Sequence, residues 1–329
     1  MKKSLFVLGV AVAALASCTQ NEVLEVAEGR AIGFDAFVNN QTKAVTPVTA
    51  ITSSQFYVFG EYATTTDSWT TEGSAFKNET GDATYYWEPN KTYRFGAYAD
   101  GLSGQLSNAS FDAANSTLKF TGYTPKDLDL VAAVSADIDS QDATQATNAN
   151  NVSLTFKHML SQVKLTFTTD ASSTYLLTIS NVSISNAVST ADGTLVSSTG
   201  TPTWDNSTAT DGYTYEEFNE GGQLVSKNAP VDQVKLVIPQ NNTDNITVTF
   251  TATVKAEGTG TTTFTAKLGH TLTDANTWKP GYCYNYTANV KLDKVLDNLG
   301  ENNVPILFEP SVEGWQTEQN VPVTPEAQN

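Results

Sequence analysis

The chain has 329 residues and a formal net charge of −17, from 35 acidic and 18 basic side chains. Hydrophobic residues make up 40% of it, which is enough apolar material for folded cores and excludes a wholly disordered chain. An acidic chain without a cluster of Lys and Arg is poorly suited to a phosphate backbone, so we expect no nucleic-acid partner. The length predicts about two domains.

Residues 1–17 have the pattern of an export signal. Lys2 and Lys3 precede the apolar residues 5–16. These twelve residues are too few to span a bilayer core, which takes about twenty. We therefore interpret the segment as a signal peptide that is removed, and not as a transmembrane helix.

The end of this segment, Leu15-Ala16-Ser17-Cys18, resembles a bacterial lipobox. The resemblance implies cleavage before Cys18 and acylation of Cys18, with palmitate as the expected lipid. Residues 18–30 are polar and acidic, which is typical of a tether between a lipid and a fold. We expect an exported lipoprotein, anchored to the outer membrane at the cell surface through its lipid.

The rest of the chain is dominated by apolar residues that alternate with polar ones. Residues 246–254 alternate Ile, Val, Phe and Ala with Thr, and 163–168 and 284–292 follow the same rule. A period of two indicates half-buried strands, and this habit is typical of antiparallel sheets. No long helical stripe interrupts the pattern. The sequence therefore predicts an all-β protein of two tandem antiparallel β-sandwich domains.

We place these domains at residues 31–172 and 173–329, with the boundary between a strand that ends at Thr169 and one that starts near Tyr175. Residues 139–151 and 189–212 are polar, and we expect both to be long surface loops. The first of them contains carboxylate and amide oxygens but lacks the spacing of a calcium-binding loop. We expect no metal site there.

No catalytic motif is present in the sequence. His158 and His270 are 112 positions apart, and neither has a motif partner beside it. His158 lies between apolar residues and fits a core or turn position, and Cys283 fits a small core position in a strand. We expect a protein that is not an enzyme and that needs no cofactor.

Five segments stand out besides the lipobox and an Ile-x-Phe strand near the N-terminus: Tyr85–Pro89, Tyr93–Tyr98, Asp127–Ala132, Leu154–Leu165 and Trp278–Tyr286. Together they resemble the fimbrillin family, the lipoprotein-derived pilus subunits known as type V pilins and their Mfa-like relatives. Their order and spacing match the family over most of the mature chain. The resemblance implies two transthyretin-like sandwich domains and polymerisation into a surface pilus that supports adhesion.

The family's assembly mechanism implies a strand that is removed by a trypsin-like protease. Residues 31–43 are the candidate strand and cleavage loop, and one face of the strand carries Ile32, Phe34, Ala36 and Val38. Cleavage between Lys43 and Ala44 would release this strand. Arg30 is a weaker candidate because it precedes the strand, and Lys43 also fits an exposed loop residue without a role.

An extended segment of the next subunit would then enter the open groove as a donor strand. Residues 304–329 contain the candidate donor, with Ile306, Phe308, Val312 and Trp315 as its apolar residues. The same residues fit the last strand of their own domain equally well, and the sequence leaves both interpretations open.

The partners implied are other pilin subunits, in a homopolymer or a heteropolymer, and a receptor of unknown identity. A stalk subunit, a basal anchor and a tip subunit all remain open. The alternative from a different class is a monomeric surface lipoprotein that binds glycan. Its sugar-stacking aromatics would be Trp69, Trp204 or Tyr213, which lie in polar stretches.

Overall fold

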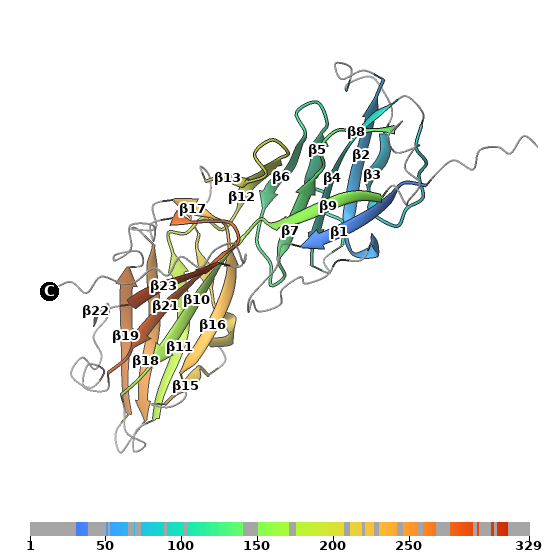
Figure 1. Cartoon of the computed structure of the whole chain (residues 1–329). Helices are drawn as coiled ribbons and strands as arrows, with labels where there is room; N and C mark the ends of the chain where they lie inside the picture. The colour runs from blue at the N-terminus through green and yellow to red at the C-terminus, as the bar shows by residue number, and fades with distance from the viewer. Residues whose placement is uncertain are drawn as a thin grey trace, which may run out of the picture.

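The computed structural model describes residues 31–38, 51, 53–64, 69, 74–88, 91–101, 104–140, 151–170, 176–206, 211–218, 221–226, 230–241, 246–255, 259–267, 277–291, 295, 304–305 and 308–314. Nearly all of them lie in β-strands and turns, with two short 3-10 helices, η1 (Ser53–Gln55) and η2 (Glu216–Phe218). The predicted all-β fold is confirmed. Figure 1 shows an elongated arrangement, with strands β1–β9 towards one end and β10, β11 and β15–β23 towards the other.

The first strands form a seven-stranded sheet in the order β1-β9-β7-β4-β2-β3, with β8 paired to β4. Its strands are β1 (Gly33–Val38), β2 (Tyr57–Ala63), β3 (Ser74–Thr80), β4 (Thr92–Asp100), β7 (Leu130–Val134), β8 (Ile138–Asp139) and β9 (Asn151–His158). The pairing is antiparallel except between β1 and β9, which run parallel. Trp87, Tyr93 and Phe95 are buried in the core of this sheet, as large aromatic side chains usually are.

A smaller sheet has the order β13-β12-β6-β5. It contains β5 (Ala109–Asp112), β6 (Thr117–Tyr123), β12 (Ala191–Val196) and β13 (Pro202–Asp205). The expectation of a loop over residues 189–212 was therefore wrong. Ala191, Gly193 and Leu195 alternate with more exposed neighbours, and this small-residue strand carries little of the hydrophobicity that reveals most strands. Gly193 is needed because a Cβ there would lie 2.8 Å from the Trp204 ring.

The remaining strands form two packed sheets and one short pair. One sheet has the order β16-β10-β21-β23, with β10 (Ser161–Thr168), β16 (Val231–Val237), β21 (Tyr282–Asn289) and β23 (Phe308–Gly314). The other has the order β14-β11-β18-β19-β22 with β15 on β11, and it contains β11 (Leu176–Ser185), β14 (Tyr213–Thr214), β15 (Gln223–Val225), β18 (Thr247–Lys255), β19 (Thr259–Lys267) and β22 (Val304–Pro305). The pair is β17 (Gln240–Asn241) with β20 (Thr277–Trp278).

The core of these sheets follows the predicted alternation. Ile246, just before β18, and residues 248, 250, 252 and 254 on β18 are buried, and the threonines between them are half-buried on the opposite face. Leu165, Phe167 and Tyr286 come from the facing sheet and belong to the same cluster as Phe250. The predicted strands over 163–168 and 246–254 are confirmed, and the strand predicted over 284–292 is confirmed as far as Asn289, where β21 ends.

A third apolar cluster joins the two ends of the molecule. It combines Tyr98 and Phe120 from the first strands with Leu236 and Ile238 from the later ones. Met159 and Leu160, which connect β9 to β10, are fully buried in this cluster. The boundary at residues 172 and 173 stays a prediction, although β12 follows it in sequence and pairs with β6, and β13 pairs with β12.

His158 lies beside this cluster at the end of β9. Its Nδ1 contacts a carboxylate oxygen of Asp129, and both side chains are buried. Burial raises the pKa of Asp129 above its usual range, because a low-dielectric environment disfavours the carboxylate. The pair occupies a structural position between two strands, as the sequence indicates for His158.

Candidate functional site: the groove that holds the first strand

The first strand lies at one end of the seven-stranded sheet. It pairs with β9 in a register that runs from Gly33↔Asn151 to Val38↔Phe156. On its other side, the main-chain contacts that the described residues make lie just before the strand, where Ile32 N donates to Tyr85 O at 2.8 Å and Ala31 bridges Tyr86. Over most of its length, β1 is therefore an edge strand held by one neighbour among the described residues.

The inner face of this strand fills an aromatic groove. Phe34 lies in edge-to-face contact with Phe56, Phe76 and Phe95, at ring-centroid distances of 5.9, 5.2 and 5.4 Å. Ile32 is 4% exposed and belongs to the same core. Such ring contacts add stability beyond the area they bury, so Phe34 anchors the strand.

The next residues of the strand alternate between the core and the solvent. Ala36 packs on the edge of the core that holds Phe34, while the intervening Asp35 is exposed. The backbone of Val38 continues the register opposite Phe156. The predicted strand face therefore lies along the groove, over the part that the structure describes.

The outer face of the strand is held by a polar contact. Asn151 Nδ2 donates a 2.8 Å hydrogen bond to Asp35 Oδ1. Its Oδ1 lies close over Gly33, where an added Cβ would approach it to 2.2 Å. At Asp35 and Asn151 the outer face is polar and solvent-exposed, and the absence of a side chain at Gly33 makes room for Asn151.

The rim of the groove is formed by residues 85–88, and tyrosines fix it. Tyr85 donates from its hydroxyl to Glu79 at 2.5 Å, and this hydrogen bond raises the pKa of Tyr85. The hydroxyl of Tyr93 accepts a 2.8 Å hydrogen bond from Glu88 N. Burial raises the pKa of Tyr93 to about 12, because the phenolate is poorly solvated there.

This arrangement holds an extended strand. Without β1, the rings of Phe56, Phe76 and Phe95 would line an open groove, and β9 would have an unpaired edge. Both features recognise an extended peptide by main-chain pairing and by pockets for alternate side chains. Within the described ranges, no cluster of His, Cys, Asp and Glu is suited to a metal ion.

The other predicted processing and donor residues fall into two groups, those outside the described residues and those in β23. Cys18, Arg30, Lys43, Ala44, Ile306 and Trp315 lie outside the described residues. Phe308 and Val312 lie in β23, where their backbones pair with Ala288 and Tyr284 of the same chain. In this structure β23 completes its own sheet, and the donor role stays a prediction.

The aromatics considered for glycan stacking are not exposed. Trp69 is 6% and Tyr213 is 8% exposed. Trp204 is half-buried, and its Nε1 donates to Met159 O at 2.7 Å. Their polar sequence surroundings suggested surface positions, but all three pack into cores. The expectation that they offer free stacking faces was wrong.

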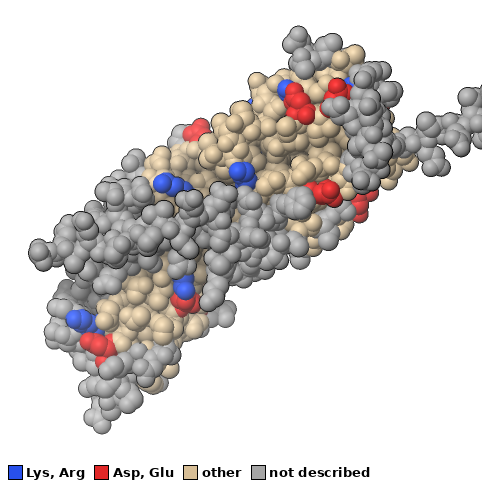
Figure 2. Space-filling view, viewed as in Figure 1, with Lys and Arg blue, Asp and Glu red and all other residues tan. Residues whose placement is uncertain are grey.

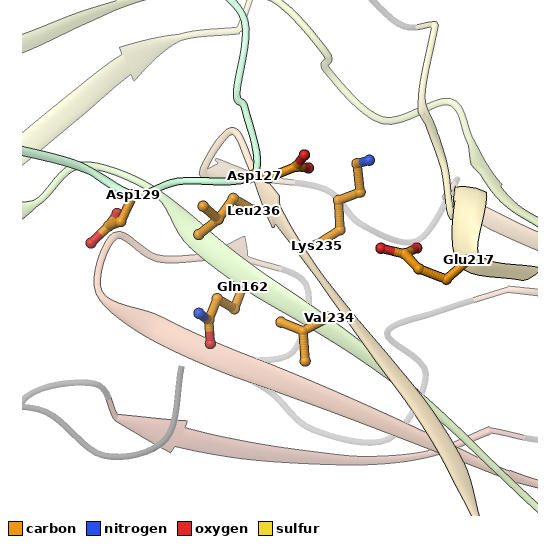
Figure 3. A pocket seen from close by; sticks show the side chains of 7 residues that line it. All are labelled: Asp127, Asp129, Gln162, Glu217, Val234, Lys235 and Leu236. Carbon is orange, nitrogen blue, oxygen red and sulfur yellow. The ribbon is translucent and has the colours of Figure 1, made fainter. Parts of the chain in front are cut away.

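Among the residues coloured in Figure 2, the acidic and basic side chains lie scattered in small groups. A small pocket near the middle of the molecule has a volume of about 60 Å³, and Asp127, Gln162, Glu217 and Lys235 are among the residues that line it. Figure 3 shows these side chains around β16. The volume holds only a few water molecules, so the pocket is not a ligand site of ordinary size.

No helix in the described part of the chain is long and apolar enough to cross a membrane.

The chain is similar to known proteins along most of its length. A family model described as fimbrillin-like matches residues 24–315. A fimbrial protein from Bacteroides vulgatus is 15% identical with a TM-score of 0.55, and the match covers 87% of this chain and 100% of that one. A protein from Bacteroides uniformis described as a putative cell adhesion protein is 18% identical with a TM-score of 0.46, at 87% and 99% coverage. The fimbrial anchor protein Mfa2 from Porphyromonas gingivalis is 8% identical with a TM-score of 0.35, at 87% and 98% coverage. No curated protein sequence matches the chain.

Proposed function

Because the chain belongs to the fimbrillin-like family, we propose that it is a structural, non-enzymatic subunit of a cell-surface pilus that supports adhesion. The observation that carries the proposal is the seating of Phe34. A single strand at the end of its sheet inserts an aromatic side chain among Phe56, Phe76 and Phe95, yet most of its second edge has no partner among the residues that the structure describes. Such a strand can be exchanged for another of similar pattern.

The proposed assembly begins with export and acylation at Cys18, which anchors the subunit in the outer membrane. A trypsin-like protease then cuts between Lys43 and Ala44 and releases residues up to Lys43, including β1. The groove accepts an extended segment of the next subunit, and main-chain hydrogen bonds to β9 are restored. Cleavage at Arg30 would leave β1 in place, so Lys43 suits this mechanism better.

Among the roles in a pilus, we favour the stalk. A stalk subunit needs both a removable strand and a donor segment, and Lys43 with residues 304–329 supplies candidates for both. A basal anchor would keep its lipid and β1, whereas a tip subunit would lack a usable donor. The glycan-binding alternative loses its support, because Trp69, Trp204 and Tyr213 are buried or half-buried.

The test is the N-terminal sequence of the protein in pili sheared from native cells. We expect Ala44 as the first residue, in an SDS-resistant ladder. The variant Lys43→Gln should keep β1 and abolish the ladder. The variant Arg30→Gln should lose β1 and form the ladder as the wild type does. An acylated Cys18 with β1 intact, found only in membranes, would refute the stalk role.

A further inference from the structure

The outer side of one sheet is built from hydroxyl side chains. In β11 and β18, which lie side by side in Figure 1, every second residue fills the core and the residues between lie on the outer side, half-buried or exposed. Each cross-strand pair there joins two hydroxyl residues: Thr178↔Thr253, Ser180↔Thr251, Ser183↔Thr249 and Ser185↔Thr247. We call these residues the hydroxyl face. The rows continue in backbone register onto β19, with the pairs Thr249↔Thr265, Thr251↔Thr263 and Thr253↔Thr261.

A bulge in β11 keeps this face continuous. The register shifts between Ser180 and Ser183, where Asn181 has a φ of 53°, a left-handed conformation that Asn adopts more readily than most residues. The extra residue shifts the alternation, so Val182 and Ile184 enter the core and Ser183 stays on the outer side. The bulge therefore keeps hydroxyl residues on one side along the whole strand.

The hydroxyl face carries no charge. Apart from Lys255 at the end of β18, the strands β11 and β18 contain no charged residue. The facing sheet differs, because Lys164 and Asp232 form an ion pair on its outer side. Charges spread over a surface keep copies of an acidic protein apart. The hydroxyl face lacks this protection.

Two exposed leucines lie at one corner of the face. Leu224 of β15 pairs with Thr178, and Leu176 precedes Thr178 by two positions, so both leucines lie on the outer side as diagonal neighbours. Leu176 is 46% exposed and Leu224 is 53% exposed. Large apolar side chains that are exposed together indicate a contact surface, whereas single ones do not. The corner adds apolar area to a face of hydroxyls.

A second copy of the same face fits this surface. A hydroxyl both donates and accepts a hydrogen bond, so an array of hydroxyls can bond to an identical array, which a row of carboxylates cannot do. The chain has a formal net charge of −17, so two copies repel each other and approach most easily where the surface is neutral. Two such sheets would pack face to face, about 10 Å apart, around a two-fold axis.

The face is too small to hold a stable dimer by itself. Strands about 4.8 Å apart, with alternate residues about 6.7 Å apart, give roughly 400 Å² per copy over β11, β18 and β19. Two faces then bury roughly 800 Å², which is below the roughly 1,200 Å² of a stable specific interface. In a polymer the same contact recurs at every subunit, and linked weak contacts reinforce one another. The contact is therefore suited to polymers and not to free subunits.

We propose that the hydroxyl face binds the same face of a second copy in a neighbouring polymer, so that pili associate side by side. The proposal rests on the proposed function for the existence of the polymer. It concerns the contact between two pili and not the joint between subunits within one. Leu176 and Leu224 lie at the rim of this contact.

The test uses pili sheared from cells and imaged by electron microscopy. We expect bundles, and a larger bundled fraction when NaCl is raised from about 0.1 to about 0.5 M, because salt screens the repulsion between acidic subunits. At the lower salt, Thr251→Lys should reduce the bundled fraction at least about tenfold, since the two-fold axis brings like charges together at every repeat. The matched control is Thr287→Lys, at a half-buried threonine on an inner strand of the facing sheet, and it should bundle as the wild type does.

A charge exchange separates a lost contact from a folding defect. Pili of Thr251→Lys and pili of Thr251→Glu should each stay single, and a mixture of the two should bundle, because opposite charges then face each other. Failure of the mixture to bundle would overturn the two-fold contact. Equal loss of bundling in Thr251→Lys and Thr287→Lys would overturn the assignment to the hydroxyl face.

The remaining outcomes separate the inference from the proposed function. Wild-type pili that form SDS-resistant ladders but stay single at both salt concentrations would overturn the inference alone. If no pili form, the proposed function fails, and beads coated densely with the purified protein test the face without polymerisation. Beads that clump in high salt, but not when they carry Thr251→Lys, would support the contact. Beads that clump only after a neutral polysaccharide such as dextran is added would overturn it and identify a glycan as the occupant.

Discussion

The indole Nε1 of Trp204 donates a 2.7 Å hydrogen bond to the main-chain oxygen of Met159. Trp204 comes from β13, while Met159 lies in the connection between β9 and β10. The same indole packs on Tyr123, with ring centroids 5.8 Å apart. One side chain therefore ties the smaller sheet to the point where the chain passes from the first group of strands to the second.

Replacing Trp204 should loosen this connection. We expect Trp204→Ala to lower the free energy of unfolding by about 2–3 kcal/mol, because it removes both packing and the hydrogen bond. Trp204→Phe keeps most of the packing and should cost about 1 kcal/mol. Urea unfolding measures both values. Thr203→Ala, on the same strand, removes only an exposed hydrogen bond to Thr194; it is the control and should cost less than about 1 kcal/mol.

Phe34 should be the main anchor of the first strand in the uncleaved chain. Phe34→Ala leaves a space among Phe56, Phe76 and Phe95, and should lower the free energy of unfolding by about 2–4 kcal/mol. Asp35→Ala removes only an exposed hydrogen bond and should cost less than about 1 kcal/mol. Similar losses for the two variants would contradict the aromatic groove as the site that holds β1.

Alkaline pH should destabilise the groove through Tyr93. Burial raises its pKa from 10.0 to about 12, so the unfolded chain loses this proton before the folded chain does. The stability tied to the neutral phenol is fully present below pH 10 and is lost as the pH rises towards 12. Tyr93→Phe should be less stable at pH 7, because Glu88 N loses its acceptor, and the difference should shrink between pH 10 and 12. Burial also raises the pKa of Tyr98 to about 12, so Tyr98 adds to the alkaline sensitivity. Tyr98 is left unchanged in both proteins, so that the comparison reports on Tyr93.

The parts of the fold that the sequence predicts are those with strong alternation. In β18 the contrast between Val or Phe and Thr is large, and the buried face follows from it directly. In β12 the buried residues include Ala191 and Gly193, so the contrast is weak and the strand is missed. The fold class is predicted from many alternating strands, so missing one strand does not change that prediction.

Contacts between distant strands follow a different rule. Asn151 and Asp35 are 116 positions apart, and their hydrogen bond exists only because β1 and β9 pair in parallel. No local pattern marks either residue. The inner face of β1 was predictable from its spacing, whereas the residue that contacts its outer face depends on pairing that spacing does not encode.

Gly33 and Asn151 should be energetically coupled. Gly33→Ala places a Cβ 2.2 Å from Asn151 Oδ1, so the amide must rotate and lose its bond to Asp35. We expect a loss of about 1 kcal/mol. In an Asn151→Ala background the obstacle is absent, and the same substitution should cost close to nothing. A double-mutant cycle by urea unfolding measures this coupling, and strictly additive effects would show that Asn151 does not contact position 33 in solution.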